Sequence, residues 1–230
     1  MLEIIATCID DAIKIEACGG QRIELVSGLT EGGLTPSYAL VKNVVERVKI
    51  PVNVMIRPHA KSFIYTKEDI KIMEEDINIV KELKANGIVI GMVDENGSID
   101  ERNLQKLLRT AEGLDITFHR AIEETKDLVE SIKILAKYPQ IKRVLTSGGK
   151  GKPMDNLSTI CRMIEAGKGK IEIMVGGGMT KETLAPVIKK TGTKEVHFGT
   201  AVRINNSPFY DINCEKLKEI AEEYKKATEN

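Results

Sequence analysis

The chain has 230 residues, of which 42% are hydrophobic and 30% charged, a composition typical of a globular protein rather than a disordered or fibrous one. Its 34 Lys and Arg balance its 34 Asp and Glu, so no overall field would attract nucleic acid or an anionic membrane. No apolar run approaches the roughly 18 residues that span a bilayer, and Glu3, Asp10 and Asp11 interrupt the N-terminal stretch, which argues against a signal peptide. We therefore expect a cytoplasmic protein with mostly reduced thiols and with no nucleic-acid or membrane partner.

The cysteines show none of the spacings that are typical of a zinc site. The four are Cys8, Cys18, Cys161 and Cys214. Structural or incidental roles are therefore expected, and no metal site is predicted from them. Cys8 lies just past the first predicted strand, which makes it the one cysteine placed near a functional edge.

One pattern repeats from end to end: a short β-branched run, a loop with Gly, Pro or Ser, and an amphipathic helical segment. The predicted strands are 2–7, 22–27, 52–57, 88–93, 116–121, 143–148, 171–176 and 195–200. The clearest helical segment runs from Thr66, a plausible N-cap, to Gly87, a plausible stop. Its apolar face consists of Ile70, Met73, Ile77, Val80 and Leu83, at spacings of three and four.

Eight strands that alternate with helices within 230 residues predict an α/β protein of the (β/α)8 TIM-barrel type. A doubly wound open sheet is the alternative, because its strands and helices alternate in the same way. The count of eight and the absence of a Gly-x-Gly-x-x-Gly motif after the first strand favour the barrel. No linker or change of composition divides the chain, so a single domain over 1–230 is expected.

Strand alternation predicts an unusually charged barrel interior. In 116–121, Ile116 and Phe118 suit the helix-facing layer, so Thr117 and His119 face inward and Arg120 lies at the rim. The charged or titratable side chains that this alternation assigns to the interior include Glu3, Glu24, Arg57, His119 and His197.

Buried charges must meet one another or a ligand. A site at the C-terminal ends of the strands would make Glu24, Arg57, His119, Arg120 and His197 candidate catalytic residues, with the carboxylates and imidazoles in acid and base roles. Glu3, near the start of its strand, is a candidate ligand contact. The alternative is an internal salt-bridge lattice that fills the barrel.

Three glycine-rich loops follow the last strands and suggest an anion site. They contain Ser147-Gly148, Gly177-Gly178 and Gly199-Thr200. Barrels often bind phosphate with the backbone N–H groups of the loops after strands seven and eight, so these residues are candidate ligand contacts. Tight turns that simply require glycine are the alternative.

Two earlier loops are long for plain connections, which raises the expectation of substrate contact. One is 27–37, where Pro36 and Ser37 would open the next helix. The other follows the third strand and carries Arg57, His59, Lys61 and Tyr65.

With these residues placed, the sequence closely resembles the copper homeostasis protein CutC family. The matching segments are "RIELVSGLTEGGLTPS" (22–37), "IPVNVMIRP" (50–58), "TFHRA" (117–121), "RVLTSGG" (143–149), "GGG" (176–178) and "EVH" (195–197). They run in family order over nearly the whole chain. The resemblance implies a cytoplasmic TIM-barrel protein, usually a homo-oligomer, that is linked by name to copper tolerance, without a settled catalytic reaction.

The chain departs from the family pattern at both strand cysteines. Where members often have "EVCVDS" and "IELCS", this chain has Ile5 and Val26, which cannot ligate a metal. Cu(I) prefers thiolate or thioether ligands, so direct copper binding is not expected at these positions, and Cys8 and Met55 are left as the alternative soft ligands. The family segment "RPRGGDF" is also changed, to 57–63 "RPHAKSF", so this loop is expected to bind something different.

Three functions remain open at this point. The resemblance implies a role in copper homeostasis, with copper as the cofactor that the family name suggests. The charges at the catalytic face favour an enzyme for a small polar molecule, with phosphorylated molecules included, in which Glu24 and His119 are the acid–base candidates and Arg57 and Arg120 the anion clamps. A non-catalytic scaffold with an internal ionic lattice is the third.

Overall fold

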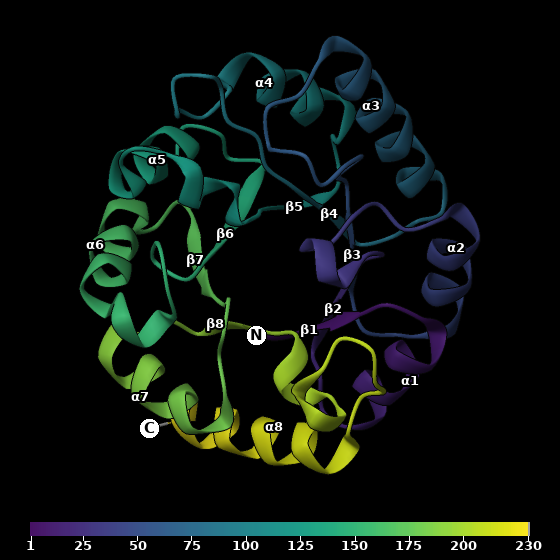
Figure 1. Cartoon of the computed structure of the whole chain (residues 1–230), viewed down its shortest axis with the longest axis vertical. Helices are drawn as coiled ribbons and strands as arrows, with labels where there is room; N and C mark the ends of the chain where they lie inside the picture. The colour runs from purple at the N-terminus through teal and green to yellow at the C-terminus, as the bar shows by residue number, and fades with distance from the viewer. Residues whose placement is uncertain (230) are drawn as a thin grey trace.

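The predicted TIM barrel is confirmed: a computed structural model of the chain contains a closed barrel of eight parallel strands in the order β1 to β8. It describes residues 1–229, and Asn230, which the expected domain includes, lies outside the described residues. Figure 1 shows the helices arranged as an outer ring around the strands. Among residues 1–229 no helix has both the length and the apolar character needed to cross a membrane.

All eight predicted strands are present. They are β1 (Leu2–Ala6), β2 (Arg22–Leu25), β3 (Val52–Met55), β4 (Gly87–Ile90), β5 (Asp115–Phe118), β6 (Ile141–Thr146), β7 (Glu172–Val175) and β8 (Glu195–Phe198). The α-helices that cover them are α1 (Ile9–Ala17), α2 (Tyr38–Arg47), α3 (Lys67–Glu82), α4 (Glu101–Thr110), α5 (Leu128–Leu135), α6 (Leu157–Gly167), α7 (Lys181–Thr191) and α8 (Cys214–Glu229). The barrel closes where Ile4 of β1 lies opposite both Ile23 of β2 and Phe198 of β8.

Most strands end two or three residues before their predicted C-terminal limits. β5 ends at Phe118, so His119 is not a strand residue as expected but the residue that caps the short 3-10 helix η2 (Arg120–Glu124). Its imidazole Nδ1 accepts the Ala121 N–H at 3.1 Å, which turns the chain away from the strand path. The last residues of each apolar run therefore belong to the βα loops, where a TIM barrel carries its site.

Helix α3 begins where the sequence predicts but ends earlier. Thr66 is its N-cap, as predicted, and forms a reciprocal capping box with Asp69. The predicted stop at Gly87 is wrong: the helix ends at Glu82, and Lys84 adopts a left-handed conformation with φ 58°. Gly87 instead opens β4, where a Cβ would lie 2.1 Å from the carbonyl oxygen of Asp115 on the neighbouring strand.

The barrel interior has an ionic floor below a small apolar layer. Arg22 binds Glu3 and, at 2.7 Å, Glu195, while Arg143 forms an ion pair with Asp115 and lies 3.7 Å from Glu195. Above this floor, a separate cluster from four neighbouring strands or strand ends fills the centre, formed by Ile5, Val26, Met55 and Val89. The main core lies between the strands and the helices.

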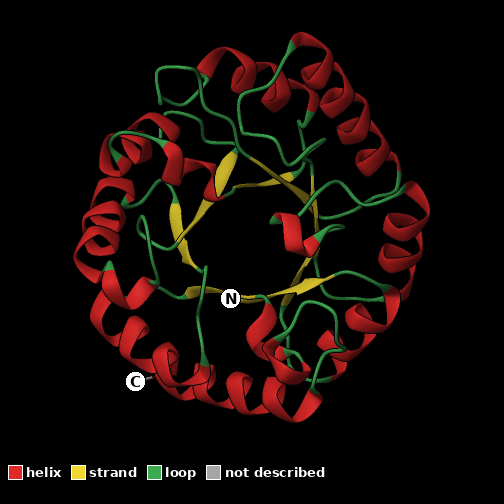
Figure 2. Ribbon diagram, in the orientation of Figure 1, coloured by secondary structure: helices red, strands yellow, loops and turns green. Residues whose placement is uncertain are grey.

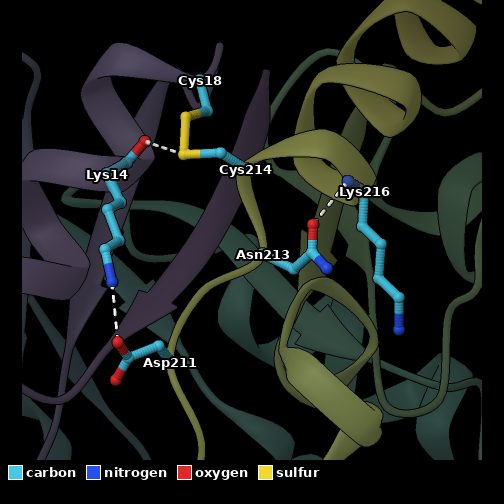
Figure 3. Close-up of a disulfide and its surroundings, with 6 residues drawn as sticks. All are labelled: Lys14, Cys18, Asp211, Asn213, Cys214 and Lys216. Atoms are coloured by element: carbon cyan, nitrogen blue, oxygen red, sulfur yellow. Dashed lines mark hydrogen bonds and ion pairs between the residues drawn. A yellow bond between two sulfur atoms is a disulfide. The ribbon is translucent and has the colours of Figure 1, made fainter.

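A disulfide joins Cys18 at the end of α1 to Cys214 at the start of α8, as Figure 3 shows. The two Cα atoms are 5.5 Å apart, a separation that suits a disulfide. Beside it, the Lys14 ammonium of α1 lies 2.8 Å from the Asp211 carboxylate, which precedes α8. The expectation of mostly reduced thiols is therefore wrong for this pair, since two distant segments place these sulfurs in contact. Cys8 and Cys161 are free.

Replacing Cys214 with serine tests how much this cross-link contributes. The bond joins residues 196 apart, so its loss raises the conformational entropy of the unfolded chain. This should lower the free energy of unfolding by roughly 2–4 kcal/mol. Urea unfolding of Cys214→Ser without reductant should match wild type in excess dithiothreitol. Cys161→Ser is the control and should behave as wild type, and equal stability of all three proteins would contradict the prediction.

Candidate active site

A cavity of about 260 Å³ opens at the C-terminal end of the barrel. Nine residues predicted from the sequence line it: Glu24, Arg57, His119, Arg120, Gly177, Gly178, His197, Gly199 and Thr200. Apolar side chains complete the wall, among them Ile5, Leu29, Met55, Leu145 and Met179. In Figure 2 the short helix η1 (Leu29–Glu31) projects over the ring of strands, and its Leu29 contributes to this wall. The cavity is smaller than a typical ligand pocket of roughly 300–1,000 Å³ and suits a small molecule.

Three predicted ligand contacts do not line the cavity. Glu3 is fully buried beneath it, on the ionic floor. The Ser147 N–H and hydroxyl both donate to Glu123 Oε1, at 2.6 and 2.9 Å, and the Gly148 N–H donates to Thr146 Oγ1 at 2.9 Å. The loop after β6 therefore holds a carboxylate of the protein itself in the place where an external anion was expected.

His119 is a neutral hydrogen-bond donor. Burial, with the nearby charge of Arg57, lowers its pKa to about 3. Because Nδ1 accepts the Ala121 N–H, the single proton of the neutral ring lies on Nε2. Nε2 is buried, lacks a hydrogen-bond partner, and belongs to a residue that lines the cavity. This imidazole can thus donate a hydrogen bond to a ligand oxygen.

Gly91, which follows β4, provides the space for that imidazole. A Cβ at this position would lie 2.4 Å from His119 Nδ1 and 3.0 Å from the Ala121 Cβ. Any side chain would therefore displace the ring or break its backbone hydrogen bond. The sequence offered a signal for this residue, since a glycine inside a β-branched run often marks a close approach.

Arg57 is buried between the second and third loops. Its Nη1 donates to the carbonyl oxygens of Glu31 and Gly33, at 2.7 and 3.1 Å, and its guanidinium lies 4.6 Å from the centre of the Phe63 ring. The Phe63 ring in turn lies 5.0 Å from the His119 ring. Its Nε is buried without a partner. Arg57 both holds the loop after β2 in place and keeps a positive charge beside the cavity.

Glu24, His197 and Glu3 form a chain of titratable groups across β2, β8 and β1. His197 Nδ1 lies 2.8 Å from Glu3 Oε1, and His197 Nε2 lies 3.7 Å from Glu24 Oε2. Burial would raise the pKa of Glu3, but the Arg22 charge and the His197 hydrogen bond lower it to about 2, so Glu3 stays ionised and orients the imidazole.

The outer member of this chain can exchange a proton near neutral pH. Burial raises the pKa of Glu24 to about 7, against the lowering effect of His197. Burial alone would lower the pKa of His197, but the two carboxylates raise it. Glu24 Oε1 has no partner and belongs to a residue that lines the cavity. Glu24 can therefore accept or donate a proton there, with His197 as its partner.

Glu123, which sequence reasoning missed, fixes the cavity rim. It accepts from Ser147, and its Oε2 accepts from Arg120 Nη2 at 2.7 Å. The Arg120 guanidinium lies 3.0 Å from where a Cβ of Gly177 would be, and Gly177 has φ 79°, so only glycine suits this contact. Arg120 is half exposed at the mouth of the cavity. Its other guanidinium donors can meet an incoming anion.

The other polar residues of the loop after β3 do not line the cavity. His59 Nε2 lies 3.4 Å from the Asp69 carboxylate, and the buried Tyr65 hydroxyl has a pKa raised to about 12 by burial. Lys61 is exposed and, together with Asp94, lines a separate surface hollow outside the cavity. Their expected contact with a substrate in this cavity is not supported.

Soft side chains lie partly at the cavity and partly away from it. Ile5 and Val26 pack with Met55 in the apolar layer, and Met55 and Met179 line the cavity. Cys8 is exposed and caps α1, where its sulfur accepts the Asp11 N–H at 3.4 Å. Among residues 1–229 no group of three His, Cys, Asp or Glu side chains has an arrangement that could hold a metal ion.

The raised pKa of Glu24 predicts a pH dependence of stability. Between about pH 4.5 and 7 the native state binds this proton more tightly than the unfolded state, so the free energy of unfolding falls as pH rises. Glu24→Gln removes the ionisation. The decrease in the free energy of unfolding between pH 5 and pH 8, measured by urea unfolding, should therefore be about 2 kcal/mol smaller in this variant than in wild type. The exposed control Glu172→Gln should keep the wild-type loss. An unchanged loss in Glu24→Gln would disprove the assignment.

Both the sequence and the fold are similar to those of known proteins. The model of the CutC family matches residues 1–202. A human relative named copper homeostasis protein cutC homolog is 38% identical over 197 residues, which cover 86% of this chain and 72% of the relative. A CutC family protein of Pasteurella multocida is 36% identical over 210 residues, covering 90% and 86%.

A solved structure extends this likeness to the fold. The crystal structure of a copper homeostasis protein CutC from Streptococcus agalactiae is 33% identical and superposes with a TM-score of 0.81 over 87% of this chain and 98% of the other. The family match, the relatives and the barrel agree with the resemblance read from the motifs. The chain belongs to the CutC family.

Proposed function

We propose that the chain is an acid–base enzyme that acts on a small polar molecule with an anionic group. One observation carries the proposal: three buried polar atoms without a partner belong to side chains that line the same cavity. They are Glu24 Oε1, Arg57 Nε and His119 Nε2. Buried polar groups are nearly always hydrogen-bonded, and each unpaired one costs roughly 1–3 kcal/mol. A ligand that pairs with all three offsets that cost.

The cavity supplies both kinds of group that such an enzyme needs. Glu24 exchanges a proton near neutral pH, while His119 and Arg57 stabilise negative charge without giving up a proton. Arg120 and the loop at Gly177 lie at the mouth, where they can receive the anionic end of the molecule. The apolar wall limits water around the reacting atoms and strengthens these interactions.

A role in copper homeostasis, which the names of the relatives carry, is the second candidate. Its support within the cavity is the pair of thioethers from Met55 and Met179, since Cu(I) selects soft ligands. The hydrocarbon side chains of Ile5 and Val26 oppose it, because Ile5 lines the cavity and Val26 packs with it in the apolar layer. The cytoplasmic location and the homo-oligomer expected from the sequence stay predictions.

Ligand-induced stabilisation tests the enzyme proposal. A panel of phosphate esters and carboxylates of two to six carbons should contain compounds that raise the Tm of wild type. Arg120→Ala should weaken such a compound about tenfold or more, because a hydrogen bond to a charged group is worth roughly 1.5–3 kcal/mol. Arg47→Ala, an exposed arginine on α2, should bind as wild type. Failure of the whole panel, or equal binding by Arg120→Ala, would remove the proposal.

Copper binding is tested directly with Cu(I). In a titration against a competing Cu(I) chelator, we expect wild type to take no copper from the chelator, because the two family cysteine positions carry branched hydrocarbon at Ile5 and Val26. Met55→Leu, which removes one thioether, should give the same curve. One equivalent of copper bound by wild type and lost in Met55→Leu would place the metal in the cavity and reverse the order of the candidates.

A further inference from the structure

The three unpartnered atoms come from different sides of the barrel. Glu24 extends from β2, His119 follows β5, and Arg57 follows β3, which lies between them in the strand order. Figure 1 shows β2 and β5 on different sides of the ring, with β3 and β4 between them. A ligand within the cavity therefore meets a carboxyl group on one side and two hydrogen-bond donors on the others.

The donors and the carboxyl group divide the chemistry between them. Nε2–H of His119 has no acceptor in the protein and is available to an oxygen atom of a ligand, and the nearby Arg57 guanidinium adds positive charge. Glu24 Oε1 has no donor and is the acceptor available for a proton. The ligand that satisfies this arrangement presents an oxygen that gains negative charge and a hydrogen that leaves as a proton.

From this arrangement, and resting on the proposed function, we infer that the substrate is a small hydroxy-carbonyl compound, and that the enzyme moves a proton at the carbon next to the carbonyl group. Glu24 takes the proton as the C–H bond breaks. The electron pair of that bond forms a carbon–carbon double bond, and the carbonyl π pair moves to the oxygen. His119 and Arg57 stabilise the resulting enolate oxygen. Glu24 then returns the proton to the same carbon, or to the former carbonyl carbon while the hydroxyl proton moves to the enolate oxygen and the hydroxyl-bearing carbon becomes the new carbonyl, so no oxidant, reductant or co-reactant is needed.

The surroundings suit this step better than a reaction with water. The neutral imidazole can donate a strong hydrogen bond to the enolate without competing with Glu24 for the proton. His197 lies 3.7 Å from Glu24 and is held by Glu3, so the proton can be shared between two groups while the intermediate persists. The apolar wall of Ile5, Leu145 and Met179 faces the same space and lowers the local dielectric constant, which strengthens these hydrogen bonds.

The mouth adds a second recognition element for the same substrate. Arg120 is held by Glu123 and lies against the loop at Gly177. A phosphate or carboxylate at the far end of the substrate can meet the remaining Arg120 donors and the backbone of this loop. The substrate class is thus a hydroxyaldehyde or hydroxyketone of few carbons that carries an anionic group.

Deuterium exchange followed by proton NMR tests the inference. Wild type is incubated in D2O with three- to six-carbon aldoses and ketoses, each with and without a phosphate ester, and with 2-oxo acids. We expect one phosphorylated or carboxylated hydroxy-carbonyl compound to lose its proton next to the carbonyl at least 100-fold faster than in buffer. With Glu24→Gln, purified in parallel, the exchange rate should be at least 10²-fold lower than with wild type, which is a typical contribution of general acid–base catalysis.

His119→Gln and the controls separate the donor role from the base role. Glutamine keeps a donor but not the fixed ring, so exchange should fall about tenfold or more while the ligand still binds. The matched controls His59→Gln and Glu172→Gln lie outside the cavity and should exchange as wild type. Exchange that survives in Glu24→Gln would overturn the inference.

Binding is measured in the same samples by the broadening of the ligand signals. A panel compound that binds wild type but does not exchange would overturn the proton-transfer inference and leave the proposed ligand site standing. A panel in which nothing binds and nothing exchanges would remove both. The two failures are therefore distinguishable.

Discussion

The buried carboxylate of Glu3 couples the base of this barrel to the cavity above it. One oxygen accepts from Arg22, which also binds Glu195, and the other pairs with His197 at the cavity. A fully buried charge without partners destabilises the folded state by several kcal/mol. Removing either Arg22 or His197 would therefore destabilise the protein. The position of His197, and through it the proton equilibrium of Glu24, depends on this one residue.

The two interpretations of the charged interior apply to different layers. The floor is a lattice in which Arg22 and Arg143 meet Glu195 and Asp115, and its groups are largely paired within the protein. One layer higher, Glu24 and His119 keep atoms without partners. Arg143 Nε on the floor also lacks a hydrogen bond, so it is the combination of unpaired atoms with a position on the cavity wall that distinguishes the site from the lattice.

Periodicity was sufficient to predict the barrel, its eight strands and most of the cavity. Alternation along β2 and β8 places Glu24 and His197 inward without further information, because side chains of a strand point to opposite faces in turn. It failed where the strand ends: His119 reaches the cavity as a helix cap, and its role as a neutral donor depends on a backbone hydrogen bond that no spacing encodes. Glu123 was missed for a similar reason, since its partner Ser147 lies on the next loop.

The pairing of β1 with β8 also sets the order in which the barrel can be completed. Leu2 lies beside Val196, and the nearby disulfide joins residues 18 and 214, so the first strand made has no permanent neighbour on one side until almost the whole chain exists. At about 5–20 residues per second, that interval lasts roughly 10–40 s on the ribosome. During it, β1 presents an open edge of backbone donors and acceptors, the kind of surface on which wrong strands add and chaperones act.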